Sequence, residues 1–205
     1  MPPSSNDRDT RGLSDSEKRQ VHENRMDRPP YSLADPSKPF NTIYSGACFC
    51  ERVKFRISRE KPLDAKYCHC TGCQVLHGAP FQWAAIFEKS DVHFYEGRDQ
   101  LIYWNTGEKS TEYILPCKVY CNHCRAPIMD EGRNMLLLFP TLIQFKDVRS
   151  KLNFKPSCHI FYSRRAIDVP DGIPKWAEHK DESEQISENF PPHNEPAREN
   201  EVGKL

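Results

Sequence analysis

The sequence has no long apolar run, and its charges balance. An uncharged apolar stretch of about eighteen residues, the length that a membrane-spanning helix needs, is absent. Residues 1–20 contain no hydrophobic segment of the kind found in secretory signals, which favours a cytoplasmic protein, with the nucleus as the other possibility. With 29 basic and 29 acidic residues the formal net charge is zero. Because no basic surplus would attract nucleic acid or an anionic membrane, we expect neither as a partner.

Helical periodicity is also scarce, because no window of about twelve residues places its apolar side chains on one helical face. The sequence instead shows alternation of apolar and polar residues. Val53, Phe55 and Ile57 alternate with basic residues, which is typical of a strand with one buried face. Similar short runs, rich in aromatic and β-branched residues, follow between Gly, Asn, Asp and Pro. The sequence therefore predicts an all-β domain of several short strands.

Both ends of the chain are poor in apolar residues. Residues 1–40 contain six prolines, seven acidic and seven basic residues, a composition that predicts a disordered leader. Residues 175–205 carry eight acidic and four basic groups, and we assign residues 177–205 to a disordered acidic tail. All nine cysteines lie between these segments. The folded domain is therefore predicted to span residues 41–176.

The nine cysteines are grouped, and without a secretory signal they favour metal binding over disulfides. Residues two apart on a strand project to the same side, so a Cys-x-Cys pair can present both sulfurs to one ion. A Cys-x-x-Cys pair does the same through a tight turn. Seven cysteines fall into such motifs: Cys48 and Cys50; Cys68, Cys70 and Cys73; Cys121 and Cys124.

Seven clustered thiols allow one site with four sulfurs and one with three. The contiguous triple Cys68, Cys70 and Cys73 can hold a metal ion by itself. A closed site of four thiolates suits a structural zinc, whereas three protein ligands and an exchangeable fourth are the pattern of catalytic zinc. We expect two zinc ions per chain. The four-sulfur site would then use the remaining residues: Cys48, Cys50, Cys121 and Cys124.

Two alternatives stay open at this point. The cysteines could pair as disulfides, or a histidine could close the three-sulfur site and make both sites structural. His77, four residues after Cys73, is the better candidate, because His69 on a strand would point away from the metal of its neighbours. The two isolated cysteines, Cys117 and Cys158, are interpreted as small buried apolar residues.

Four segments of the sequence carry a family resemblance. They are GACFCERVKF at 46–55, YCHCTGCQVLHGAPF at 67–81, YCNHCRAPI at 120–128 and HIFYSRRAIDVPDGIPKW at 159–176. This pattern resembles the glutathione-dependent formaldehyde-activating enzymes, which share their domain with centromere protein V. The resemblance implies a tent-like all-β zinc fold over residues 41–176 with the same division of the seven cysteines. It also implies the condensation of glutathione with formaldehyde to S-hydroxymethylglutathione, which in reverse is a carbon–sulfur lyase reaction.

The sequence departs from the family pattern in two places. Family members commonly have glycine around the second Cys-x-x-Cys, where this chain has Asn122 and Arg125. Because arginine adopts a left-handed backbone less readily than glycine, we expect either a differently built knuckle or an Arg125 that faces a ligand. Ile167 stands where an aromatic residue is often found.

As an enzyme of this kind, the protein would use the second zinc to capture a thiol such as glutathione, which then attacks an aldehyde. The alternative is a non-catalytic, zinc-stabilised β module for protein interaction. Phe81 and Trp83, which follow the cysteine triple, are candidates for a pocket floor or for the core. Glutathione is anionic at neutral pH, so a basic or hydrogen-bonding wall is expected beside the metal. Its candidates are Arg52, Lys54, His77, Lys118 and Arg125.

Overall fold

The computed structural model describes residue 14, residues 24–33, residue 37 and residues 39–187. Within them the chain is built mainly of short strands, and the prediction of an all-β domain is confirmed. No helix in these ranges is long and apolar enough to cross a membrane. The expectations for the other leader residues and for residues 188–205 lie outside the described part of the chain.

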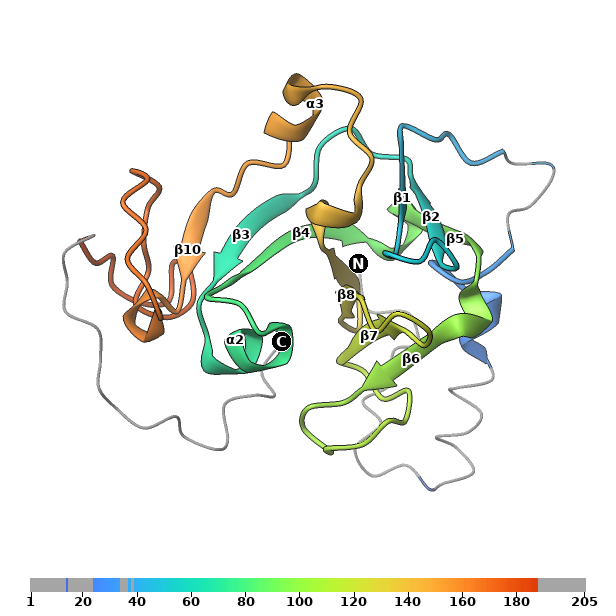
Figure 1. The fold of residues 1–205 in the computed structure, drawn as a ribbon, viewed down its shortest axis with the longest axis horizontal. Coiled ribbons are helices and arrows are strands. Elements are labelled where there is room, and N and C mark those ends of the chain that lie inside the picture. Colours follow the sequence, from blue (N-terminus) through green and yellow to red (C-terminus); the bar gives the residue numbers. More distant parts are fainter. Residues whose placement is uncertain (1–13, 15–23, 34–36, 38, 188–205) are drawn as a thin grey trace.

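The strands form two sheets, which Figure 1 shows side by side. Neighbouring strands are antiparallel except β10 and β3, which are parallel. The smaller sheet has the order β1 (Tyr44–Ala47), β2 (Lys54–Ile57) and β5 (Val92–Glu96). The larger sheet has the order β10 (Cys158–Ile160), β3 (Asp64–Cys68), β4 (Gln82–Glu88), β9 (Met135–Leu138), β8 (Pro127–Glu131), β7 (Cys117–Cys121) and β6 (Leu101–Trp104).

The helices in the described ranges are short. Helix α2 (Thr71–His77) follows β3 directly: the Sγ of its N-cap Cys70 accepts the N–H of Cys73, and Gly78 ends the helix in a left-handed conformation. The other helices are α3 (Val148–Leu152) and the 3₁₀ turns η1 (Asn24–Asp27), η2 (Lys89–Asp91), η3 (Arg98–Gln100), η4 (Pro140–Leu142) and η5 (Tyr162–Arg164).

The core contains side chains from strands of both sheets and is rich in aromatic and branched residues. The alternation predicted around β2 is confirmed, because Val53, Phe55 and Ile57 are fully buried. Phe55 packs edge-on against Phe94 of β5, with ring centroids 5.8 Å apart. Burial of such side chains supplies most of the driving force for a small β domain.

Two segments outside the predicted range 41–176 also belong to the folded domain. Tyr31 is fully buried and stacks on Phe94. At the other end Ile186 is buried, and its N–H donates to the carbonyl of Lys175. In residues 24–33 and 177–187 the tertiary structure thus supplies apolar and backbone partners for segments whose own composition is poor in apolar residues.

Candidate metal centres

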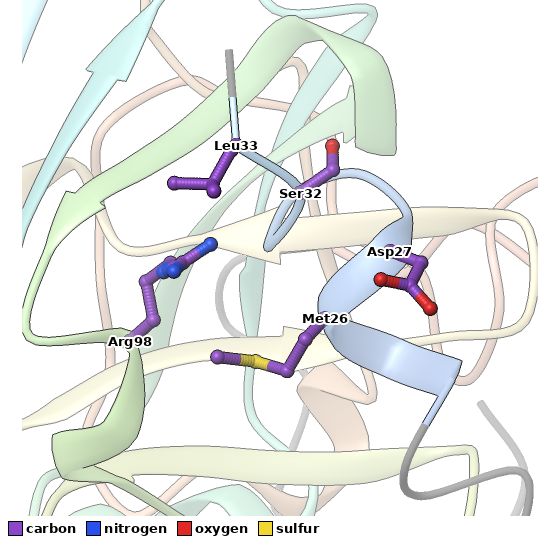
Figure 2. A pocket seen from close by; sticks show the side chains of 5 residues that line it. All are labelled: Met26, Asp27, Ser32, Leu33 and Arg98. Carbon is purple, nitrogen blue, oxygen red and sulfur yellow. The ribbon is translucent and has the colours of Figure 1, made fainter.

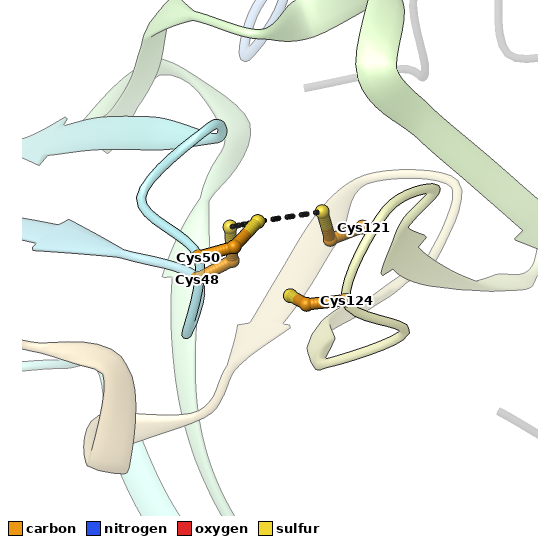
Figure 3. A group of neighbouring side chains, drawn as sticks. All are labelled: Cys48, Cys50, Cys121 and Cys124. Carbon is orange, nitrogen blue, oxygen red and sulfur yellow. Dashed lines mark hydrogen bonds between the residues drawn. The ribbon is translucent and has the colours of Figure 1, made fainter.

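The first group of cysteines joins the loop after β1 to the end of β7 (Figure 3). The Sγ atoms of Cys48, Cys50, Cys121 and Cys124 all lie within 4.8 Å of one another. The Sγ atoms of Cys48 and Cys50 are 3.5 Å apart, and those of Cys50 and Cys121 are 3.8 Å apart. A disulfide would need about 2.05 Å, and all nine cysteines are free thiols. The disulfide alternative is wrong for this structure.

Backbone geometry holds this first group in two tight knuckles. Glu51 and Arg125 follow the second cysteine of each motif, and both have a φ of 60°. Their N–H groups close the turns onto the carbonyls of Cys48, at 2.9 Å, and Cys121, at 3.0 Å. Arg125 thus adopts the conformation that glycine would favour. Its exposed side chain donates to Asn122 Oδ1 at 3.3 Å, within the same turn.

The second group is local in sequence. Cys68 ends β3, Cys70 is the N-cap of α2, and Cys73 is buried in the first turn of that helix. Their Sγ atoms lie within 4.8 Å of one another, and the Cys73 N–H donates to Cys70 Sγ at 3.3 Å. Hydrogen bonds with Cys68 and Cys73 lower the pKa of the Cys70 thiol to about 2. The backbone of this short segment alone therefore brings three sulfurs together.

The two histidines considered for closing the second site lie elsewhere. Among the described residues the second group contains no histidine or carboxylate within 4.8 Å of all three sulfurs. His77 ends α2 outside this group, so the structure does not make it a fourth ligand. His69 is fully buried, and its Nε2 lies 2.8 Å from Nδ1 of His159. The other ring nitrogen of His159, Nε2, lies 3.0 Å from Oδ2 of Asp171. His69 thus anchors the C-terminal segment instead.

A buried polar cluster adjoins the cysteine triple. Lys118 on β7 donates to Asp130 Oδ2 at 2.8 Å, and Gln82 on β4 donates to the same oxygen at 3.0 Å. Burial disfavours the ammonium form of Lys118, but the adjacent Asp130 carboxylate raises its pKa, so Lys118 is charged. Gln82 pairs with Cys68 in the β3–β4 ladder. The charge of Lys118 also works to lower the pKa of the Cys73 thiol, against stronger effects within the triple.

The other candidates for a substrate wall are distributed more widely. Lys54 pairs with Glu96 of β5 at 3.0 Å, and Arg52 is an exposed residue of the loop before β2. Trp83 donates from its indole Nε1 to the carbonyl of Phe154 and packs against the core. Phe81 lies against the rings of Tyr67 and His69, at centroid distances of 5.0 Å.

The two isolated cysteines behave as the sequence predicts. Cys117 and Cys158 are both buried. Burial raises the pKa of both thiols, which keeps them protonated and unreactive near neutral pH.

One surface hollow is lined by residues that belong to neither cysteine group (Figure 2). It has a volume of about 330 Å³ and is next to η1. Arg98, which lines it, donates to the backbone carbonyl of Tyr31 at 2.8 Å and so holds the N-terminal segment in place. The lining residues are Met26, Asp27, Ser32, Leu33 and Arg98.

Taken together, the fold and the two groups define a mostly β, cysteine-rich domain in which each group could hold a metal ion. The sequence matches the family model for the glutathione-dependent formaldehyde-activating enzyme over residues 43–164, which is more than half of the chain. The chain belongs to this family.

Comparison with curated sequences and with solved structures does not indicate a function. No curated protein sequence matches the chain. A crystal structure of a Rhodobacter sphaeroides protein is similar to it, with 18% identity and a TM-score of 0.41 over 52% of this chain and 94% of that chain. A similarity of this size carries no argument about function.

Proposed function

We propose that this protein catalyses the reversible joining of glutathione and formaldehyde to S-hydroxymethylglutathione, as a zinc-dependent carbon–sulfur lyase. The observation that carries the proposal is the triple of Cys68, Cys70 and Cys73, which brings three sulfurs together without a fourth ligand from the described residues. Three protein ligands and one exchangeable position are the pattern of catalytic zinc. Membership of the formaldehyde-activating family supports the choice of thiol and aldehyde.

The donor set fits zinc in both groups. Sulfur atoms at the corners of a tetrahedron around zinc lie about 3.8 Å apart, given zinc–sulfur bonds of about 2.3 Å. The distances of 3.5 and 3.8 Å in the first group agree with this value. Cys48, Cys50, Cys121 and Cys124 would hold a structural zinc, since four thiolates close the coordination shell.

At the second site, a bound zinc would favour the thiolate form of glutathione. The sulfur attacks the aldehyde carbon, the new carbon–sulfur bond forms, and the carbonyl electron pair moves to the oxygen, which takes up a proton. Lys118 contributes a fixed positive charge beside the cysteine triple. That charge favours the thiolate form of the cysteines in the triple.

The test compares glutathione-dependent consumption of formaldehyde by the wild type and by Cys73→Ser. We expect the variant to keep one zinc per chain and its fold, and to lose activity by a factor of at least about 100, because one ligand of the second site is gone. Metal analysis and circular dichroism supply the stoichiometry and the fold. A wild type that holds two zinc ions tightly and turns over no thiol with formaldehyde would contradict the proposal and favour the interaction module.

A further inference from the structure

Two acidic residues that are neighbours in β8 lie on opposite faces of the β7–β8 ladder. Side chains alternate along a strand, so Asp130 and Glu131 point to different sides. In the ladder Asp130 pairs with Lys118 and Glu131 pairs with Cys117. Both carboxylates are almost completely buried, with exposed fractions of 2% and 1%. A buried carboxylate needs hydrogen-bond donors, so the two faces can be compared by their donors.

Both carboxylate oxygens of Glu131 accept hydrogen bonds from protein groups. Its Oε2 accepts from the hydroxyl of Tyr31 at 2.6 Å, and its Oε1 accepts from the hydroxyl of Tyr113 at 2.8 Å. The ammonium group of Lys89 lies 3.0 Å from Oε1. Both oxygens therefore have partners, as expected for a carboxylate whose role is structural.

Only one carboxylate oxygen of Asp130 accepts hydrogen bonds from the described residues. Its Oδ2 accepts from both Lys118 and Gln82, while Oδ1 has no hydrogen-bond partner among the described residues. Two neighbouring buried atoms, Oε1 of Gln82 and Nε2 of His77, also lack a hydrogen bond of good geometry. Gln82 and Lys118 are each 5% exposed. Unpartnered buried polar atoms are uncommon, and three in one cluster indicate a ligand that supplies what the protein does not.

The cluster lies beside the cysteine triple. Gln82 is the ladder partner of Cys68, and His77 is one helical turn after Cys73, on the same face of α2. The charges of Lys118 and Asp130 act on the ring of His77, and the side chain of Gln82 lies close enough to the ring to act as a weak hydrogen-bond partner, which places the ring among them. A group bound at the three sulfurs would therefore have the three unpartnered atoms as neighbours.

We propose that His77, Gln82 and Asp130 form a subsite that binds the hydroxyl group of the thiol–aldehyde adduct and of the hydrated aldehyde. This inference rests on the proposed function, since it assigns the polar partner of the reacting carbon. The oxygens of Gln82 and Asp130 can only accept, and His77 Nε2 can accept or donate. An O–H group meets two of the three, because it donates its single hydrogen to the oxygen of Asp130 or Gln82 and accepts from His77 Nε2 through its own oxygen.

The charge of the subsite disfavours the carboxylates of glutathione. Asp130 already neutralises Lys118, and its free oxygen would repel a carboxylate. The hydroxyl of the adduct is on the same carbon as the sulfur. Sulfur at the cysteine triple and hydroxyl at the subsite would thus orient the carbon–sulfur bond that forms or breaks.

The test measures binding rather than turnover. Hydroxymethyl thioethers decompose, so the probes are S-(2-hydroxyethyl)glutathione and S-propylglutathione, which differ by a hydroxyl in place of a methyl group. Calorimetry on the zinc-loaded protein should show about tenfold tighter binding of the hydroxyl compound, the effect of about one well-placed hydrogen bond to a charged cluster. Gln82→Met should abolish the preference, and His77→Phe provides a second variant should Gln82→Met fail to fold.

Gln74, which lies in α2 like His77, provides a matched control for Gln82. Gln74 donates through its amide nitrogen to the carbonyls of His69 and Arg164, at 2.6 and 2.7 Å, and so has a structural role. Gln74→Met should be less stable but keep the hydroxyl preference. Equal binding of both probes by the wild type, or an undiminished preference in the folded Gln82→Met or His77→Phe, would overturn the subsite. Failure of the proposed function appears separately, as a wild type without glutathione-dependent formaldehyde consumption.

Discussion

The two cysteine groups use the same ligand chemistry in different structural settings. The four-cysteine group joins the loop after β1 to the end of β7, segments that are far apart in the sequence. The three-cysteine group lies within a single turn between β3 and α2. A cross-link between distant segments stabilises a fold, because it constrains a long loop. A local group with three sulfurs contributes less to stability and leaves a position for chemistry.

The same contrast holds for the polar residues of the β7–β8 ladder. On one face, Glu131 has a donor for each oxygen and ties the N-terminal segment to the sheet through Tyr31. On the other face, Asp130 keeps an oxygen without a protein partner beside the cysteine triple. A buried carboxylate with hydrogen-bond donors on both oxygens is typical of a structural site. A buried carboxylate that lacks a donor on one oxygen, next to candidate metal ligands, is typical of a ligand-binding site.

The largest effect should come from breaking the four-cysteine group. Cys121→Ser removes a buried ligand, and we expect the loss of most of the free energy of unfolding, which for a domain of this size is about 5–15 kcal/mol. Thermal unfolding followed by circular dichroism measures the effect. Cys158→Ala, at a buried cysteine outside both groups, is the control and should lower the melting temperature far less. A cooperative transition of Cys121→Ser at the wild-type temperature would show that this group does not hold the fold together.

The second-largest effect should be a difference in stability between variants of the two buried ion pairs, Lys118–Asp130 and Lys89–Glu131. Lys118→Met leaves Asp130 buried with a charge that no cation balances, which costs about 3–5 kcal/mol. Lys89→Met should cost less, because the tyrosines still donate to both oxygens of Glu131. Urea unfolding of both variants at equal zinc content measures the difference. Equal losses would mean that the two faces of the ladder do not differ in the way we describe.

The smallest effect concerns the knuckle of the four-cysteine group. Arg125→Gly should stabilise the protein by about 0.5–1 kcal/mol, since glycine adopts a φ of 60° without steric cost. Arg125→Ala is the matched control, because alanine removes the side chain but keeps the strain. The measurement is the free energy of unfolding of the zinc-loaded proteins. A destabilised Arg125→Gly would mean that the contact with Asn122 outweighs the strain.

Sequence reasoning succeeded where the relevant residues are neighbours in the chain or belong to short motifs. The strand around Phe55 was predicted from alternation, and the seven cysteines were divided into the two groups that the structure brings together. It failed for Gln82 and Asp130, which were not singled out, because a polar residue in a strand gives no sign of its partners. The burial of Tyr31 and Ile186 could not be predicted either, since each is an apolar residue in a mostly polar segment.

The mostly β class, the family and the grouping of the cysteines follow from the sequence alone, because periodicity and motif spacing are local properties of the chain. Three other relations arise only on folding: His77 lies outside the cysteine triple, His69 contacts His159, and Gln82 lies beside Cys68 and binds Asp130. These relations depend on the register of strands β3, β4, β7 and β8. Register follows from the packing of the whole sheet, which no single segment specifies.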